Sequence, residues 1–133
     1  MTDPAGLFDT SVWIALERGR ALDRASLPSI AYVAAITAGE LELAVHTARD
    51  PDTRAHRMRT WTRVTALDLL DVDLGASHEW ARLRFRLGQA GRSIGINDLW
   101  IAAIALANEL PVVTQDADFD VLSDLGGPRI IRV

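Results

Sequence analysis

The chain has 133 residues, 49% of them hydrophobic, and a formal net charge of −4 from 18 acidic and 14 basic side chains. This length and composition predict one folded domain, residues 1–133, and exclude extended disorder. Cysteine and lysine are both absent, which excludes disulfides, thiolate catalysis, Schiff-base chemistry and a lysine-containing P-loop.

The first third of the chain predicts a strand, a helix and a second strand. Apolar residues 5–8 form the first strand, which ends at Asp9. Thr10 or Ser11 is expected to cap a helix that begins at residue 12 and runs until a glycine breaks it. The second strand is expected at residues 29–33.

The middle third predicts two helices, a third strand and another helix. Apolar residues recur at helical spacing over residues 34–48. The Asp-Pro-Asp sequence at 50–52 predicts a new helix towards residue 66, because aspartate caps helices and proline suits their first turn. A strand at residues 67–72 and a helix at residues 75–90 follow.

The last third predicts a buried helix between short strands. Asp98 opens a segment over residues 99–107 that is apolar on almost every side, which is typical of a buried helix. Strands are expected at 111–114 and 129–133, with a short helix or turn at 116–125 between them. Strands that alternate with helices predict an α/β fold of three layers, a mostly parallel sheet with helices on both faces.

Charge and hydropathy restrict the setting in which the protein works. The net charge of −4 argues against binding nucleic acid through bulk electrostatics, so any such contact must be local. The longest apolar stretch, residues 30–39, is too short to span a bilayer. We therefore expect a cytoplasmic protein with no membrane contact.

Four acidic side chains, Asp9, Glu40, Asp98 and Asp116, are candidates for a functional site. Asp9 and Asp116 follow predicted strands, at the edge where open parallel sheets bind ligands. Taken singly, both are also explained as turn residues, and Asp98 as a residue that caps a helix. Glu40 interrupts an apolar helix, where a lone charged carboxylate is costly.

Considered together, these acids predict a cation site. Converging carboxylates repel one another and resist ionisation unless a cation neutralises them. Oxygen ligands favour Mg²⁺, with Mn²⁺ as a substitute. The three histidines, His46, His56 and His78, lack the spacing of zinc ligands and are expected on helix surfaces.

Four motifs in order give the chain a resemblance to a known family. Residues 7–11 (LFDTS), 36–41 (ITAGEL), 97–105 (NDLWIAAIA) and 113–119 (VTQDADF) carry one or more acids each. They resemble the acidic motifs of the PIN domain, in particular of the short VapC-like toxins of prokaryotic toxin–antitoxin pairs. The resemblance runs over nearly the whole chain.

The resemblance implies a Mg²⁺-dependent endoribonuclease that leaves a 3′-hydroxyl and a 5′-phosphate. Asp9, Asp98 and Asp116 would bind the ion, and Glu40 would act through water or as a general base. The closing motif contains two acids, so either Asp116 alone or Asp118 as well would face the metal.

Further residues are assigned supporting roles. Thr10, Ser11 and Thr114 are expected to orient the carboxylates. Arg82 and Arg86 are predicted to contact substrate phosphates, with a solvated helix face as the alternative.

The family resemblance also implies partners for the protein. It implies an RNA substrate, a homodimer and a cognate antitoxin protein. The alternative function is a catalytically inactive PIN-like binding or assembly module. A receiver domain or a dehalogenase-type phosphatase is disfavoured, because both need a lysine beside the phosphoryl group.

Overall fold

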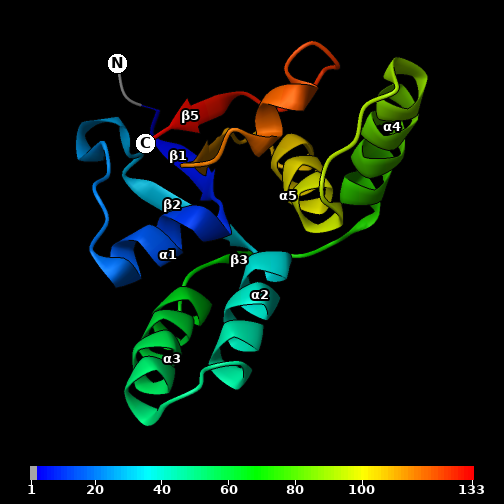
Figure 1. The fold of residues 1–133 in the computed structure, drawn as a ribbon. Helices are drawn as coiled ribbons and strands as arrows, with labels where there is room; N and C mark the ends of the chain where they lie inside the picture. Colours follow the sequence, from blue (N-terminus) through cyan, green and yellow to red (C-terminus); the bar gives the residue numbers. More distant parts are fainter. Residues whose placement is uncertain (1–2) are drawn as a thin grey trace.

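Short apolar segments form one parallel sheet in the order β3-β2-β1-β4-β5 (Figure 1). The computed structural model describes residues 3–133. The strands are β1 (Ala5–Phe8), β2 (Ile30–Ala34), β3 (Leu69–Leu70), β4 (Val112–Thr114) and β5 (Ile130–Arg132). The parallel α/β architecture predicted from the alternating pattern is confirmed.

Helices cover both faces of this sheet. The elements are α1 (Thr10–Arg18), η1 (Arg24–Ser26), α2 (Ala35–His46), α3 (Pro51–Thr65), α4 (Leu74–Ala90), α5 (Ile96–Ala107) and η2 (Asp118–Leu122). Helices α4 and α5 pack on one face, and α1 with parts of α2 and α3 packs on the other (Figure 1). In the part of the chain that the structure describes, no helix is long and apolar enough to cross a membrane.

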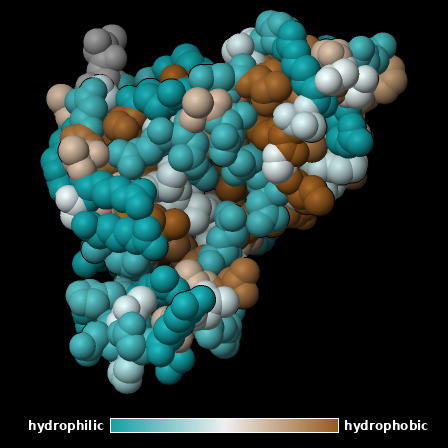
Figure 2. Space-filling view, viewed as in Figure 1, coloured by the Kyte–Doolittle hydropathy of each residue, from teal (hydrophilic) through white to brown (hydrophobic). Residues whose placement is uncertain are grey.

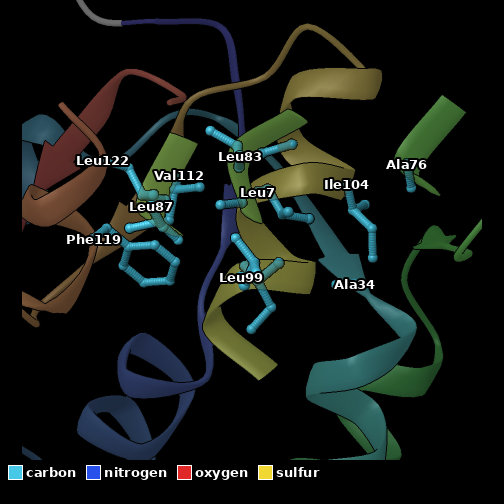
Figure 3. Close-up of a cluster of buried hydrophobic side chains, with 13 residues drawn as sticks. Leu7, Ala34, Ala76, Leu83, Leu87, Leu99, Ile104, Val112, Phe119 and Leu122 are labelled. Carbon is cyan, nitrogen blue, oxygen red and sulfur yellow. The ribbon is translucent and has the colours of Figure 1, made fainter. Parts of the chain in front are cut away.

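The pleat of the strands divides the core into two clusters. In β1, Leu7 joins the cluster beneath α4 and α5, and the next residue, Phe8, joins the cluster beneath α1 and α3. Val112 and Val113 of β4 alternate in the same way. Successive side chains of a strand point to opposite faces, so a central strand buried on both faces is apolar throughout. Figure 3 shows the first cluster around Leu7.

Helix α2 continues directly from β2, and the chain then turns back in α3, which packs against α2. The helix predicted to begin at the Asp-Pro-Asp sequence is confirmed. Asp50 accepts a hydrogen bond from the backbone N–H of Thr53 at 2.8 Å, and Pro51 occupies the first turn of α3. Arg57 of α3 donates to the carbonyl of Ala44 at 2.7 Å, which ties the two helices together. The hairpin fixes α2, and with it Glu40, beside the end of the sheet.

Two local predictions are wrong. Asp9, rather than Thr10 or Ser11, occupies the N-cap position of α1, and its side chain makes no capping bond because it points towards β4. The third strand has two residues, not six, because it pairs only at the edge of the sheet with Val33 and Ala34.

Candidate active site

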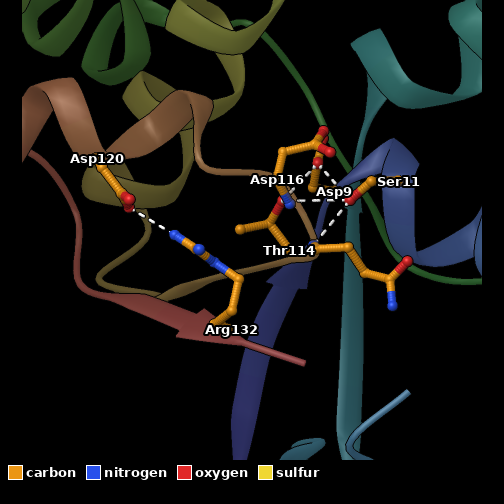
Figure 4. A network of polar contacts seen from close by, with 7 residues as sticks. Asp9, Ser11, Thr114, Asp116, Asp120 and Arg132 are labelled. Carbon is orange, nitrogen blue, oxygen red and sulfur yellow. Dashed lines mark hydrogen bonds and ion pairs between the residues drawn. The ribbon is translucent and has the colours of Figure 1, made fainter. Parts of the chain in front are cut away.

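Asp9 lies at the carboxyl end of β1 and is only 2% exposed. Its Oδ2 accepts hydrogen bonds from the hydroxyls of Ser11 and Thr114, each at 2.9 Å (Figure 4). Burial raises the pKa of Asp9 by removing water from the charged form, and the two hydroxyl bonds act in the opposite direction.

The chain after β4 fixes the direction of both hydroxyl groups. The backbone N–H of Gln115 donates to Ser11 Oγ at 3.0 Å, and that of Asp116 donates to Thr114 Oγ1 at 3.0 Å. Each hydroxyl has a single proton, so accepting from the backbone leaves that proton for Asp9. Ser11 and Thr114 therefore hold the Asp9 carboxylate in place.

Glu40 reaches the same region from α2, and a chain of hydroxyls holds it. Thr10 Oγ1 donates to Glu40 Oε1 at 2.7 Å and lies 3.1 Å from Thr37 Oγ1. Thr10 Oγ1 is also placed to donate to the Oγ1 of the fully buried Thr37, so its single proton faces two acceptors that together fix the position of Thr10. Sequence reasoning missed Thr37, although its place three residues before Glu40 puts both on one face of α2.

The pKa of Asp98 is raised strongly above its ordinary value. This residue lies in the first turn of α5, partly buried, and its pKa rises from 3.8 to about 7. Burial is the main cause, followed by the negative charges of Asp9, Asp118, Glu40 and Asp116. The rise shows that these carboxylates are close enough to oppose one another's ionisation.

Asp116 is more exposed and completes the group. Burial raises its pKa, the charges of Asp9 and Asp118 add to the rise, and Arg132 opposes it. Asp118 therefore contributes negative charge from beside the site, while Asp116 lines it. Arg132 is engaged with Asp120 at 2.6 Å, away from the carboxylate group (Figure 4).

The four predicted acids share one depression of about 340 Å³. Its lining consists of Asp9, Thr10, Ser11, Ile14, Glu40, Asp98 and Asp116. No basic side chain belongs to this lining, so nothing in it balances the four carboxylates. A cation is the partner that such a surface attracts.

The donor set fits a hard divalent cation. All its ligand atoms are carboxylate and hydroxyl oxygens, which suit Mg²⁺ and Mn²⁺, and no histidine lines the depression. Within residues 3–133, no three acidic or imidazole side chains already form a compact group of metal ligands. Binding would therefore require side-chain movement that draws the carboxylates together.

The two predicted substrate-binding arginines lie on α4, outside the depression. Arg82 pairs with Glu79 at 2.5 Å and donates to the carbonyl of Gly126 at 3.0 Å. Arg86 donates to the carbonyl of Leu125 at 2.9 Å. Both side chains fix the loop after η2, and their contact with substrate stays a prediction.

The chain is similar to known proteins over nearly its whole length. The family profile described as PIN domain matches residues 7–125. The chain is 46% identical to ribonuclease VapC5 of Mycobacterium tuberculosis, over 99% of this chain and 98% of that protein. Ribonuclease VapC4 of the same species is 36% identical, over 90% and 92% of the two chains. The crystal structure of VapBC-5 from M. tuberculosis, a member of the VapBC family of toxin–antitoxin systems, matches with a TM-score of 0.90 and 44% identity over 98% of this chain and 99% of that chain.

Proposed function

The chain belongs to the PIN domain family, and from this premise we propose that it is a metal-dependent endoribonuclease, the toxin of a VapBC-type toxin–antitoxin pair. The observation that carries the proposal is the convergence of Asp9, Glu40, Asp98 and Asp116 on one depression without a basic side chain. These acids come from four separate segments of the chain. The names of the ribonuclease relatives support the same activity.

Asp9, Asp98 and Asp116 would hold Mg²⁺, or Mn²⁺ in its place, with Asp118 adding negative charge nearby. When bound, the ion would neutralise negative charge on the phosphodiester and lower the pKa of a water molecule. Bonds from Ser11 and Thr114 keep the buried Asp9 carboxylate in one orientation.

Glu40 is the proposed general base. Its Oε1 is engaged by Thr10, so Oε2 is the oxygen left to accept a proton from the attacking water. The water oxygen bonds to phosphorus while the bond from phosphorus to the 3′-oxygen breaks. The 3′-oxygen takes a proton from solvent, which leaves a 3′-hydroxyl and a 5′-phosphate.

The partners follow from the same family membership. We propose a cognate antitoxin that inhibits the protein, as the similarity to a toxin–antitoxin complex supports, and a homodimer in the cytoplasm. Light scattering after gel filtration measures the dimer, and co-purification with the product of a neighbouring gene tests the antitoxin.

The deciding experiment maps RNA ends. The wild type and the Asp9→Asn variant are expressed, and new 5′-phosphate ends are mapped across total RNA. Glu42→Gln is the matched control, because Glu42 lies exposed on the same helix as Glu40 but outside the depression. We expect new ends with the wild type and the Glu42→Gln control only. When purified wild-type protein is incubated with RNA, a chelator should abolish the cleavage.

Identical ends from Asp9→Asn, or cleavage that continues at full rate in chelator, would refute the proposal. A folded wild type that creates no new ends would instead favour the inactive binding module.

A further inference from the structure

A second hollow lies between α4 and α5, with a volume of about 370 Å³. Its walls are mostly apolar, formed by Trp80, Leu87, Ile94, Ile96 and Leu99. Hydrophobic surface gathers between these two helices in the space-filling view (Figure 2). The volume falls in the range of small-molecule sites, about 300–1,000 Å³.

A third cleft shares lining residues with both this hollow and the carboxylate depression. Ile96, which is 76% exposed, lines both the hollow and a shallow cleft that also contains Glu40 and Asp98. Those two acids in turn line the carboxylate depression. A ligand that places one group among the acids can therefore place its next group beside Ile96.

The aromatic wall of the hollow is rigid. The rings of Trp80 and Trp100 stack with centroids 5.0 Å apart and an interplanar angle of 13°. The stack restrains Trp80, so a ligand in the hollow meets an indole held in one orientation. Flat π-systems bind well against such surfaces, and nucleobases stack on tryptophan whatever their sequence.

One arginine at the rim is available for an anion. Arg92 is engaged with Asp124 through two bonds, at 2.5 and 3.1 Å, and Arg82 and Arg86 hold the loop after η2. Arg84 is exposed, and among residues 3–133 its guanidinium makes no hydrogen bond or ion pair. Its planar fork matches a phosphate group.

We propose that this hollow holds the nucleobase of a nucleotide adjacent to the phosphate being cut, with Arg84 on a neighbouring phosphate. The inference rests on the proposed function, which supplies the phosphodiester among the acids. An apolar side chain of a protein partner would fill the same walls but would leave the charge of Arg84 unmatched. The combination of apolar walls that include a tryptophan, one free guanidinium and a cleft shared with the acids favours RNA.

The test follows the indole N–H signals of the full-length protein by NMR during titration with the four nucleoside 5′-monophosphates. Ribose 5-phosphate is the matched ligand without a base, and Trp80→Phe assigns the Trp80 signal. We expect all or some of the nucleotides to shift Trp80 and ribose 5-phosphate to leave it unchanged. Trp13, which packs on the opposite face of the sheet, is the internal control.

Two variants test the walls and the rim. Ile96→Ser is expected to raise the Kd of the nucleotides by about fivefold or more, the lower end of stacking and contact effects. Arg84→Gln is expected to raise it several-fold in low salt, whereas Arg63→Gln, an exposed arginine on α3, should not. Both changes are at exposed positions, so the fold should persist, as the unchanged Trp13 signal would verify.

The outcomes separate this inference from the proposed function. RNA cleavage together with a Trp80 signal that no nucleotide moves would overturn the base site alone. Equal shifts with ribose 5-phosphate would also overturn it, as would variants that alter only dimer formation or antitoxin binding. Nucleotide binding at Trp80 by a protein that cuts no RNA would overturn the enzymatic proposal instead.

Discussion

Replacing Asp98 with asparagine should stabilise the metal-free protein at alkaline pH. In the folded state the pKa of Asp98 is about 7, against an ordinary value of 3.8. Between these values the folded state binds more protons than the unfolded state, so the free energy of unfolding falls as pH rises through this window. Above pH 7 the loss is complete.

The size of the effect follows from the pKa change. At about 1.4 kcal/mol per pKa unit, the rise corresponds to at most about 4 kcal/mol. Asp98 is only partly buried and water screens its charge, so we expect about 2 kcal/mol. The amide of Asp98→Asn cannot ionise, which removes this loss while keeping the size of the side chain.

The assay is urea unfolding in chelator at pH 5 and pH 8. Asp98→Asn should exceed the wild type by about 2 kcal/mol at pH 8 and by much less at pH 5. The exposed Asp71→Asn serves as the matched acid-to-amide control and should change stability little at either pH. Adding Mg²⁺ should raise the Tm of the wild type more than that of Asp98→Asn. A variant that is less stable than the wild type at pH 8 would refute the reasoning, because repulsion among the acids would then not govern stability.

Three further predictions concern RNA cleavage and RNA binding. Glu40→Gln should reduce kcat for RNA cleavage by about 10²–10⁴-fold, as expected for loss of a general base, whereas Glu42→Gln should leave it near the wild-type value. Thr37→Val should lower kcat with little change in KM, because it removes the hydroxyl that bonds to Thr10 beside Glu40. Thr37→Ser should restore kcat, and failure of serine to rescue would indicate a packing role. Replacing Arg82 and Arg86 by glutamine should weaken RNA binding, measured by fluorescence anisotropy. If these arginines contact phosphates, the weakening should be greater in low salt than in high salt. Equal weakening at all salt concentrations would mean that the loop they hold has been disturbed.

Local sequence signals account for much of the fold. The apolar strands that alternate with helices predict a parallel sheet, and the Asp-Pro pair at 50–51 predicts the start of α3. The candidate acids are also recognisable, because Asp9 and Asp116 follow strand ends and Glu40 interrupts an apolar helix. These features depend on residues that are near one another in the chain.

The supporting contacts of the site depend on residues that are far apart. Ser11 is only two residues from Asp9, but Thr114 is 105 residues away, and the pairing of β1 with β4 brings its hydroxyl to Asp9. Contacts within the site also explain the error at the start of α1, since the hydroxyls of Thr10 and Ser11 bond to Glu40 and Asp9 and do not cap the helix. Likewise, the spacing of Thr37 and Glu40 places them on one face of α2, but it does not reveal that Thr10 fits between them.

The position of the site follows from the strand order of the sheet. β1 lies between β2 and β4, so the segments that leave these strands diverge at its carboxyl end, where Asp9 stands. Helix α2 departs from β2 with Glu40, and the chain after β4 brings Asp116. This divergence leaves room for a ligand, but it also gathers carboxylates whose mutual repulsion raises the pKa of Asp98. A bound cation would remove the repulsion and bring the phosphodiester to the same point, so the charges that destabilise the free protein are the ones that the proposed reaction requires.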